Sequence, residues 1–166
     1  MCIRDSYTPV GKEMVDLSEI GFRFSDEPLR EVRTDSAVNF RFAIPPHSFD
    51  HEVSARFRFP EEATILSFFP HTHLRGHRFR FDLISPKGEE ELLLELPFYD
   101  FNWQLGYDLL SPRTVPKGTY LKATAWFDNT AENPANPDPS AWVRFGEQTF
   151  EEMMIGYVNW IPAEGR

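Results

Sequence analysis

Short runs with an apolar residue at every second position, separated by prolines and glycines, constrain the fold of this chain more than any other feature. Fourteen prolines and nine glycines divide its 166 residues. In the run over 53–59, apolar residues occupy the odd positions and polar residues the even ones. Because successive side chains of a strand point to opposite faces, this spacing predicts strands with one face on a core and one toward solvent.

Similar runs cover 20–24, 38–44, 63–74, 77–85, 90–96, 119–128 and 152–160. They predict about eight or nine short strands, which is typical of an all-β fold, an antiparallel β-sandwich or jelly roll. Residues 128–139 are too polar for a core and too rich in proline for a strand, so they predict a surface loop. With 41% apolar residues, a chain of this length fills one core.

The charge balance excludes two classes of partner. Seventeen basic and 26 acidic residues give a net charge of -9, which is the wrong sign for binding nucleic acid or an anionic membrane surface. No stretch approaches the roughly 20 consecutive apolar residues of a membrane-spanning helix. We therefore expect neither nucleic acid nor a membrane as a partner.

A pair of histidines in the run over 63–74 is the strongest local signal for chemistry. His71 and His73 are two residues apart, so on a strand they project from the same face with Cα atoms about 7 Å apart. Two such imidazoles can bind one metal ion, and imidazole suits copper, zinc, iron and nickel. By itself the pair also fits a structural or surface role.

The surroundings of the pair can be predicted from the same alternation. In a straight strand, His71 and His73 share a face with Ile65 and Phe69, in a partly apolar wall where an imidazole needs a polar partner. His77 has the same parity, but Gly76 is expected to end the strand before it. A third imidazole ligand is therefore not favoured.

The segment 70–76, followed some 80 residues later by Glu151, Glu152 and Met153, resembles the C-terminal domain of the copper type II, ascorbate-dependent monooxygenases. That family includes peptidylglycine hydroxylating and dopamine β-monooxygenases and bacterial relatives. The resemblance covers about residues 7–160 and is closest to the bacterial relatives in the segments 7–9, 100–104, 127–129 and 133–137.

The resemblance implies a copper site made by His71, His73 and Met153, with Met154 packing in the core. It also implies activation of dioxygen and hydroxylation of a substrate C–H bond. A thioether favours Cu(I) and imidazoles serve both oxidation states, so this ligand set suits copper that changes its oxidation state. Zinc gains little from a thioether.

The chain departs from the peptide-hydroxylating members where they bind a substrate carboxylate. Those members have an arginine, an asparagine and a tyrosine at the positions of Phe69, Ile155 and Tyr157. Tyr157 is therefore the one candidate catalytic residue retained from that set. A carboxylate buried beside Phe69 and Ile155 would lack its counter-charge, so we expect that a glycine-extended peptide is not the substrate.

Full-length members of the family carry a second copper in an upstream domain that supplies electrons. We expect this chain to be a fragment that lacks that domain and turns over poorly alone, with the family-like domain at 7–166. Residues 1–6 match nothing expected of the family and are interpreted as an artefactual start. The family works outside the cytoplasm, which implies a periplasmic or extracellular location.

Two other classes of function remain open at this point. The chain could be a copper-binding or electron-transfer module without oxygenase activity, which the altered carboxylate-binding positions favour. It could also be a β-sandwich module that binds carbohydrate or protein through Trp103, Trp126 and Trp142, with incidental histidines. Aromatic residues in short strands are more often part of the core.

Overall fold

The computed structural model describes residues 11–15, 17, 19–27 and 30–163. Contacts divide the chain into two units, Met1–Glu31 and Val32–Arg166. The described residues of the first unit form neither helix nor strand, and the side chains of Ile20, Phe22 and Phe24 are exposed. The strand predicted over 20–24 is therefore wrong, because a strand also needs a hydrogen-bonded neighbour. The interpretation of residues 1–6 lies outside the described residues.

Ten strands and no helix occur in the described part of the second unit, so no helix there is long and apolar enough to cross a membrane. The strands are β1 (Arg33–Val38), β2 (Ala43–Ile44), β3 (His51–Arg58), β4 (Ala63–Thr72), β5 (Gly76–Ile84), β6 (Glu90–Leu96), β7 (Tyr107–Val115), β8 (Tyr120–Phe127), β9 (Val143–Arg144) and β10 (Met154–Pro162).

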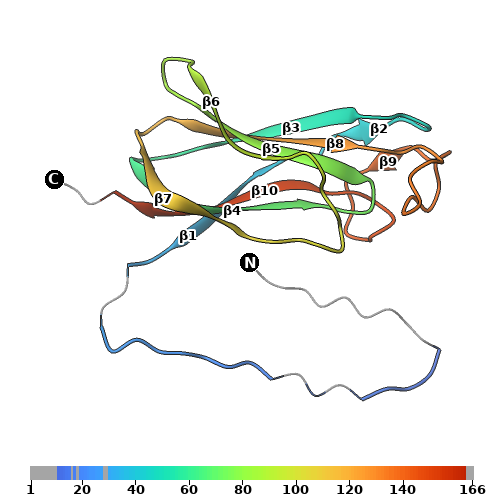
Figure 1. Ribbon diagram of the computed structural model, residues 1–166, viewed down its shortest axis with the longest axis horizontal. Helices are drawn as coiled ribbons and strands as arrows, with labels where there is room; N and C mark the ends of the chain where they lie inside the picture. The colour runs from blue at the N-terminus through green and yellow to red at the C-terminus, as the bar shows by residue number, and fades with distance from the viewer. Residues whose placement is uncertain (1–10, 16, 18, 28–29, 164–166) are drawn as a thin grey trace. The chain divides into compact units, whose positions relative to one another are not determined.

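The eight longer strands form two antiparallel sheets that lie one over the other (Figure 1). One sheet has the order β1-β10-β4-β7 and the other has the order β3-β8-β5-β6. The two-residue strands β2 and β9 pair with each other. The predicted all-β, antiparallel sandwich of short strands is confirmed.

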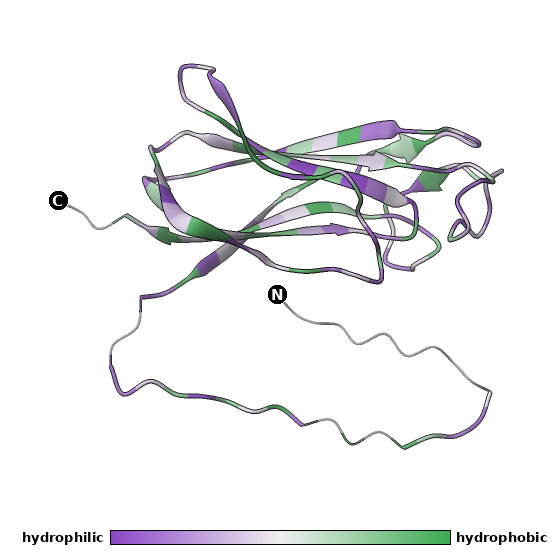
Figure 2. Ribbon diagram, viewed as in Figure 1, coloured by the Kyte–Doolittle hydropathy of each residue, from purple (hydrophilic) through white to green (hydrophobic). Residues whose placement is uncertain are grey.

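The core lies between the two sheets and is rich in aromatic rings. Phe68 of β4 stacks on Phe81 of β5, with ring centroids 4.8 Å apart. Gly156 of β10 lies so close to the other sheet that an added Cβ would be 2.5 Å from the Cβ of Ala123. Apolar and polar residues alternate along the strands, as the colours in Figure 2 show, because only one face of each sheet meets this core.

Most of the predicted strands are present, and the exceptions have local causes. Strands β3, β4, β5, β6, β8 and β10 coincide with predicted runs. The run over 38–44 is not one strand, because Val38 ends β1 and the chain turns before β2, leaving the side chain of Phe40 exposed. Strand β7 was not predicted; it contains Pro112 and mostly exposed side chains, which an edge strand tolerates.

Residues 128–139 form no strand, as predicted for a loop. The loop is not only a surface feature, however, since the side chain of Asn129 is fully buried. Residues 147–151 contain turns and bends but no helix.

A β-bulge in β4 changes which side chains accompany the histidines. The pairing of β4 with β10 and β7 shifts at Leu66, which adds one residue between Ile65 and Ser67. Beyond the bulge, Phe68 and Thr72 are buried toward the core, and Phe69 and His71 occupy the alternate positions. The prediction that His71 shares a face with Ile65 is therefore wrong, because one extra residue inverts the alternation.

Candidate metal centre

The two histidines lie side by side where β4 ends. His71 is half-buried, and His73, one residue beyond the strand, is only 4% exposed. Their ring centroids are 5.3 Å apart, with the ring planes at 83°. The strand thus brings two imidazoles together at one end of the sheet, which is the geometry that a two-residue spacing predicts.

Both imidazoles are held through the same ring nitrogen. Nδ1 of His71 lies 2.7 Å from Oε1 of Gln104, and Nδ1 of His73 lies 3.3 Å from the backbone oxygen of Glu151. Metal-binding histidines commonly use one nitrogen for such a partner and the other for the ion. This arrangement leaves the Nε2 atoms as the candidate ligand atoms.

Burial favours the neutral form that a metal requires. It lowers the pKa of His71, although the hydrogen bond with Gln104 acts in the opposite direction. Burial also lowers the pKa of His73, as does the neighbouring His71, whereas backbone hydrogen bonds with Glu151 and Gln148 raise it. A neutral imidazole keeps a lone pair for a metal ion, so both residues are suited to binding one at neutral pH.

Met153 immediately precedes β10, whose first residues pair with the end of β4. Met154 pairs with Thr72, and Ile155 pairs with His71. Thr72 and Met154 are both fully buried. Because side chains alternate, Met153 occupies a position of the same parity as Ile155, and continuing the register by one residue sets it opposite His73.

A buried carboxylate joins the two segments that carry these residues. Glu152 is fully buried, and its Oε2 accepts hydrogen bonds from the backbone N–H groups of His73 at 2.7 Å and Met153 at 3.2 Å. Its Oε1 accepts one from the backbone N–H of Arg75 at 2.7 Å. Burial raises the pKa of Glu152 to about 8, against the opposing effect of the backbone donors.

The side chain of Arg75, a residue of the turn between β4 and β5, is buried. Its Nε donates to Oδ1 of Asn129 at 2.9 Å, and its Nη1 donates to the backbone oxygen of Phe150 at 2.9 Å. The amide of Asn129 donates in turn to the backbone oxygens of Pro45 and Ala141. Sequence reasoning missed this network, because its only signal is charged and amide residues close to apolar runs.

Tyr157 lies on β10, two residues after Ile155, which pairs with His71. It pairs with Phe69, and their ring centroids are 6.2 Å apart. Phe69 and Ile155, the two positions that lack the carboxylate-binding side chains, thus flank His71 on neighbouring positions of one face. The surroundings of His71 on these two strands are accordingly apolar and aromatic.

His77 lies on β5 in the other sheet and does not join the pair. Its Nε2 is 3.2 Å from Oδ1 of Asp50, and its ring lies 5.4 Å from that of Phe49. Strand β4 ends at Thr72, before His77 as predicted, but Gly76 does not end it, because Gly76 is the first residue of β5. Within the described residues, no group of three or more His, Cys, Asp or Glu side chains is arranged to hold a metal ion.

The donor set is consistent with copper in its chemistry. Two neutral imidazoles and a thioether include no carboxylate or thiolate, which are the ligands that calcium, magnesium and structural zinc sites rely on. A soft sulfur beside two imidazoles suits copper that alternates between Cu(I) and Cu(II). These three residues therefore fit that metal better than the other common metals.

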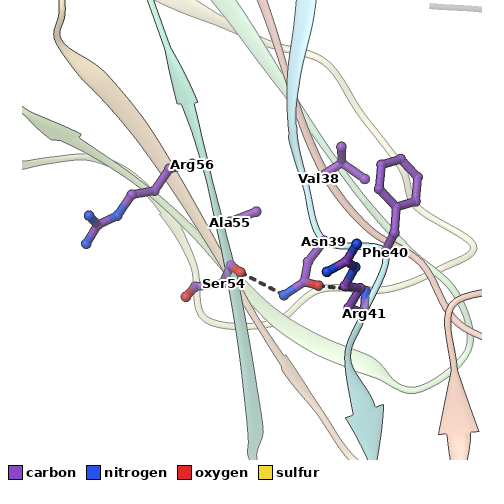
Figure 3. Close-up of a pocket in the computed structure, with 7 residues that line it drawn as sticks. All are labelled: Val38, Asn39, Phe40, Arg41, Ser54, Ala55 and Arg56. Carbon is purple, nitrogen blue, oxygen red and sulfur yellow. Dashed lines mark hydrogen bonds between the residues drawn. The ribbon is translucent and has the colours of Figure 1, made fainter.

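An open groove of about 290 Å³ lies elsewhere, where the end of β1 approaches β3. The amide of Asn39 spans it, donating to the backbone oxygen of Ser54 and accepting from the N–H of Arg41 (Figure 3). Arg56 points away from Arg41 in Figure 3, so the two cations do not converge on one anion. None of the predicted site residues lines this groove.

The tryptophans considered as a binding surface have different environments. Trp103 and Trp142 are exposed on loops, whereas Trp126 is half-buried under the guanidinium of Arg78, whose carbon lies 4.0 Å from the ring centroid. Trp160 belongs to the core.

No known family model matches the chain, and no curated protein matches it. Among solved structures, it is similar to the VP2 subviral particle of infectious bursal disease virus, with a TM-score of 0.37 and 13% sequence identity. The match covers 80% of this chain and 32% of that chain, so this chain spans about a third of the viral protein's length. A similarity this low carries no information about function.

Proposed function

We propose that this chain binds one copper ion through His71, His73 and Met153 and is the catalytic domain of a copper-dependent monooxygenase. The observation that carries the proposal is the register between β4 and β10, which pairs Ile155 with His71 and Met154 with Thr72. It brings the segment with the thioether to the end of the strand that carries both imidazoles. Bound copper would supply one-electron redox chemistry and activate dioxygen for hydroxylation of a C–H bond.

The protein's own contribution is to hold the ligands and shape their surroundings. Both imidazoles are kept neutral by burial and oriented through Nδ1. Glu152 accepts hydrogen bonds from the backbone N–H groups of His73 and Met153. The segment that carries the histidines therefore cannot separate from the segment that carries Met153 without breaking these bonds. Such support reduces the reorganisation that a metal site needs during a reaction.

The side chains next to His71 affect which substrate can bind. Phe69 and Ile155 provide no charge beside His71, which supports the expectation that a glycine-extended peptide is not hydroxylated. Tyr157, next to Phe69, is the proposed catalytic residue that contacts the substrate with its hydroxyl group. Hydroxylation of a glycine-extended peptide by the protein together with its upstream domain would contradict this expectation.

The proposal includes an upstream copper domain as electron donor and a periplasmic or extracellular location. These two parts of the proposal rest on the sequence resemblance. The chain alone is accordingly expected to bind copper but to turn over slowly.

Copper loading tests the ligand set directly. Wild type should bind one copper per chain, and His71→Ala should lose tight binding. Met153→Ala should lose the sulfur neighbour seen by X-ray absorption in the reduced protein. The exposed residues His47 and Met14 offer matched controls, and His47→Ala and Met14→Ala should leave both measurements unchanged. Unchanged loading in His71→Ala would overturn the proposed site.

A second candidate is a copper-binding or electron-transfer module without oxygenase activity. The apolar residues at Phe69 and Ile155 favour it, because they remove two of the three polar contacts expected in peptide-hydroxylating members. Ascorbate-driven oxygen consumption coupled to product formation, measured with the upstream domain present, separates the two functions. Copper binding without product formation from any tested substrate would favour the second.

A further inference from the structure

The loop between β6 and β7 contacts three consecutive residues at the end of β4. Gln104 meets Nδ1 of His71, and Phe101 lies against His73 with ring centroids 6.1 Å apart. Between them, the hydroxyl group of Tyr99 lies 3.1 Å from both the backbone N and the backbone O of Thr72. One loop thus holds both imidazoles and the peptide that joins them.

The orientation of the Gln104 amide is determined by its second hydrogen bond. Its Nε2 donates to the backbone oxygen of Phe101 at 2.9 Å, and a carbonyl oxygen can only accept. The other end of the amide, which faces His71, is therefore the oxygen. Because an amide oxygen also only accepts, Nδ1 of His71 must carry the proton and donate it at 2.7 Å.

His73 reaches the same tautomer by a different route. Its Nδ1 lies 3.3 Å from the backbone oxygen of Glu151, which likewise accepts only, so Nδ1 is the donor. In His71, Nε2 then carries the lone pair, whereas His73 has a further backbone hydrogen bond with Gln148. For His73 the backbone determines the tautomer, whereas for His71 a single side chain does so, and only the latter can be changed by substitution.

We propose that Gln104 is a positioning residue that holds His71 in the Nδ1–H tautomer, so that His71 presents Nε2 as a ligand atom. This inference rests on the proposed function for its purpose, but the tautomer is a property of the metal-free protein. A protonated Nε2 has no lone pair, so His71 in the other tautomer would have to lose that proton or rotate before binding a metal.

Nitrogen-15 NMR of the histidine rings in the metal-free protein at neutral pH tests the inference. In wild type, His71 should show a protonated Nδ1 and an unprotonated Nε2. Gln104→Leu removes the acceptor, and a mixture of tautomers or the Nε2–H form is expected. Gln104→Glu restores an acceptor and should restore the wild-type pattern. Asn102→Leu, on the same loop, is the matched control, because among the described residues the Asn102 side-chain amide bonds to Asp100 and not to a histidine.

Copper(I) affinity gives a second readout. Loss of a hydrogen-bonding partner of a metal-binding histidine typically weakens metal binding by about 10–100-fold, so Gln104→Leu should lose that much and Gln104→Glu should recover it. An Nδ1–H tautomer that persists in Gln104→Leu, or an Nε2–H tautomer in wild type, overturns the inference. If wild type shows the expected tautomer but binds no copper, the proposed function fails while the assignment of Gln104 stands.

Discussion

The turn after β4 and the middle of β5 each bury a carboxylate, and the two are stabilised in different ways. Glu152 accepts hydrogen bonds from backbone N–H groups, one of them on His73, 79 residues earlier. Asp82 is bound by the guanidinium of Arg80, two residues away on the same strand. The Arg80 side chain is 36% exposed, so it can turn to solvent if its partner is lost.

Glu152 thus connects two segments that are distant in the sequence, whereas Asp82 forms an ion pair within one strand. Removal of Glu152 would leave buried N–H groups without acceptors, and these cannot reach water. Removal of Asp82 would leave a cation that can be hydrated. The candidate metal centre is built on the first kind of support, so its geometry should depend more on buried residues than on surface charges.

The largest effect is expected for Glu152→Ala. It should lower the free energy of unfolding by about 3–5 kcal/mol, because the substitution leaves three backbone N–H groups buried without their acceptor. Urea unfolding at neutral pH measures the change. Glu132→Ala, at an exposed position, is the matched control. A loss below about 1 kcal/mol would remove the distinction between the two carboxylates.

Tyr99→Phe should have the next largest effect, about 2 kcal/mol in the free energy of unfolding. The hydroxyl group interacts with both the N–H and the carbonyl of Thr72, and both are buried. The ring remains in the core, so the substitution isolates the polar contacts. Tyr120→Phe, at a half-buried position on β8, provides a comparison, and equal losses for the two variants would contradict the expectation.

Asp82→Ala should cost about 1 kcal/mol, less than either change near the histidines. A double-mutant cycle with Arg80→Ala sharpens the comparison, because it measures the coupling between the two side chains. A loss of stability as large as that of Glu152→Ala would show that an ion pair within one strand can stabilise the fold as much as hydrogen bonds between distant segments. The proposed difference between the two carboxylates would then be wrong.

Arg113→Ala should have the smallest effect, below about 1 kcal/mol. Its guanidinium lies 2.7 Å from Glu91, but both side chains are about half exposed, at 51% and 52%. Solvent and salt screen such a pair. Unfolding curves at low and high salt should nearly coincide for wild type and variant, whereas a separation of several kcal/mol would reveal an unrecognised role.

The spacing of apolar residues was sufficient to predict the all-β class, most of the long strands and the adjacency of His71 and His73. These features depend on the alternation of side chains along a single strand, which is a local property of the backbone. The same rule failed at 20–24, where no neighbouring strand pairs, and it missed β7, whose apolar pattern is weak at a sheet edge.

Only the tertiary structure decided which polar groups meet. The bulge at Leu66 set the face on which His71 lies, and it is visible only in the pairing of β4 with its neighbours. The roles of Glu152, Asn129 and Gln104 depend on partners far away in the sequence. These three residues are stable where they lie because distant segments supply hydrogen bonds to them, and a one-dimensional pattern does not record those segments.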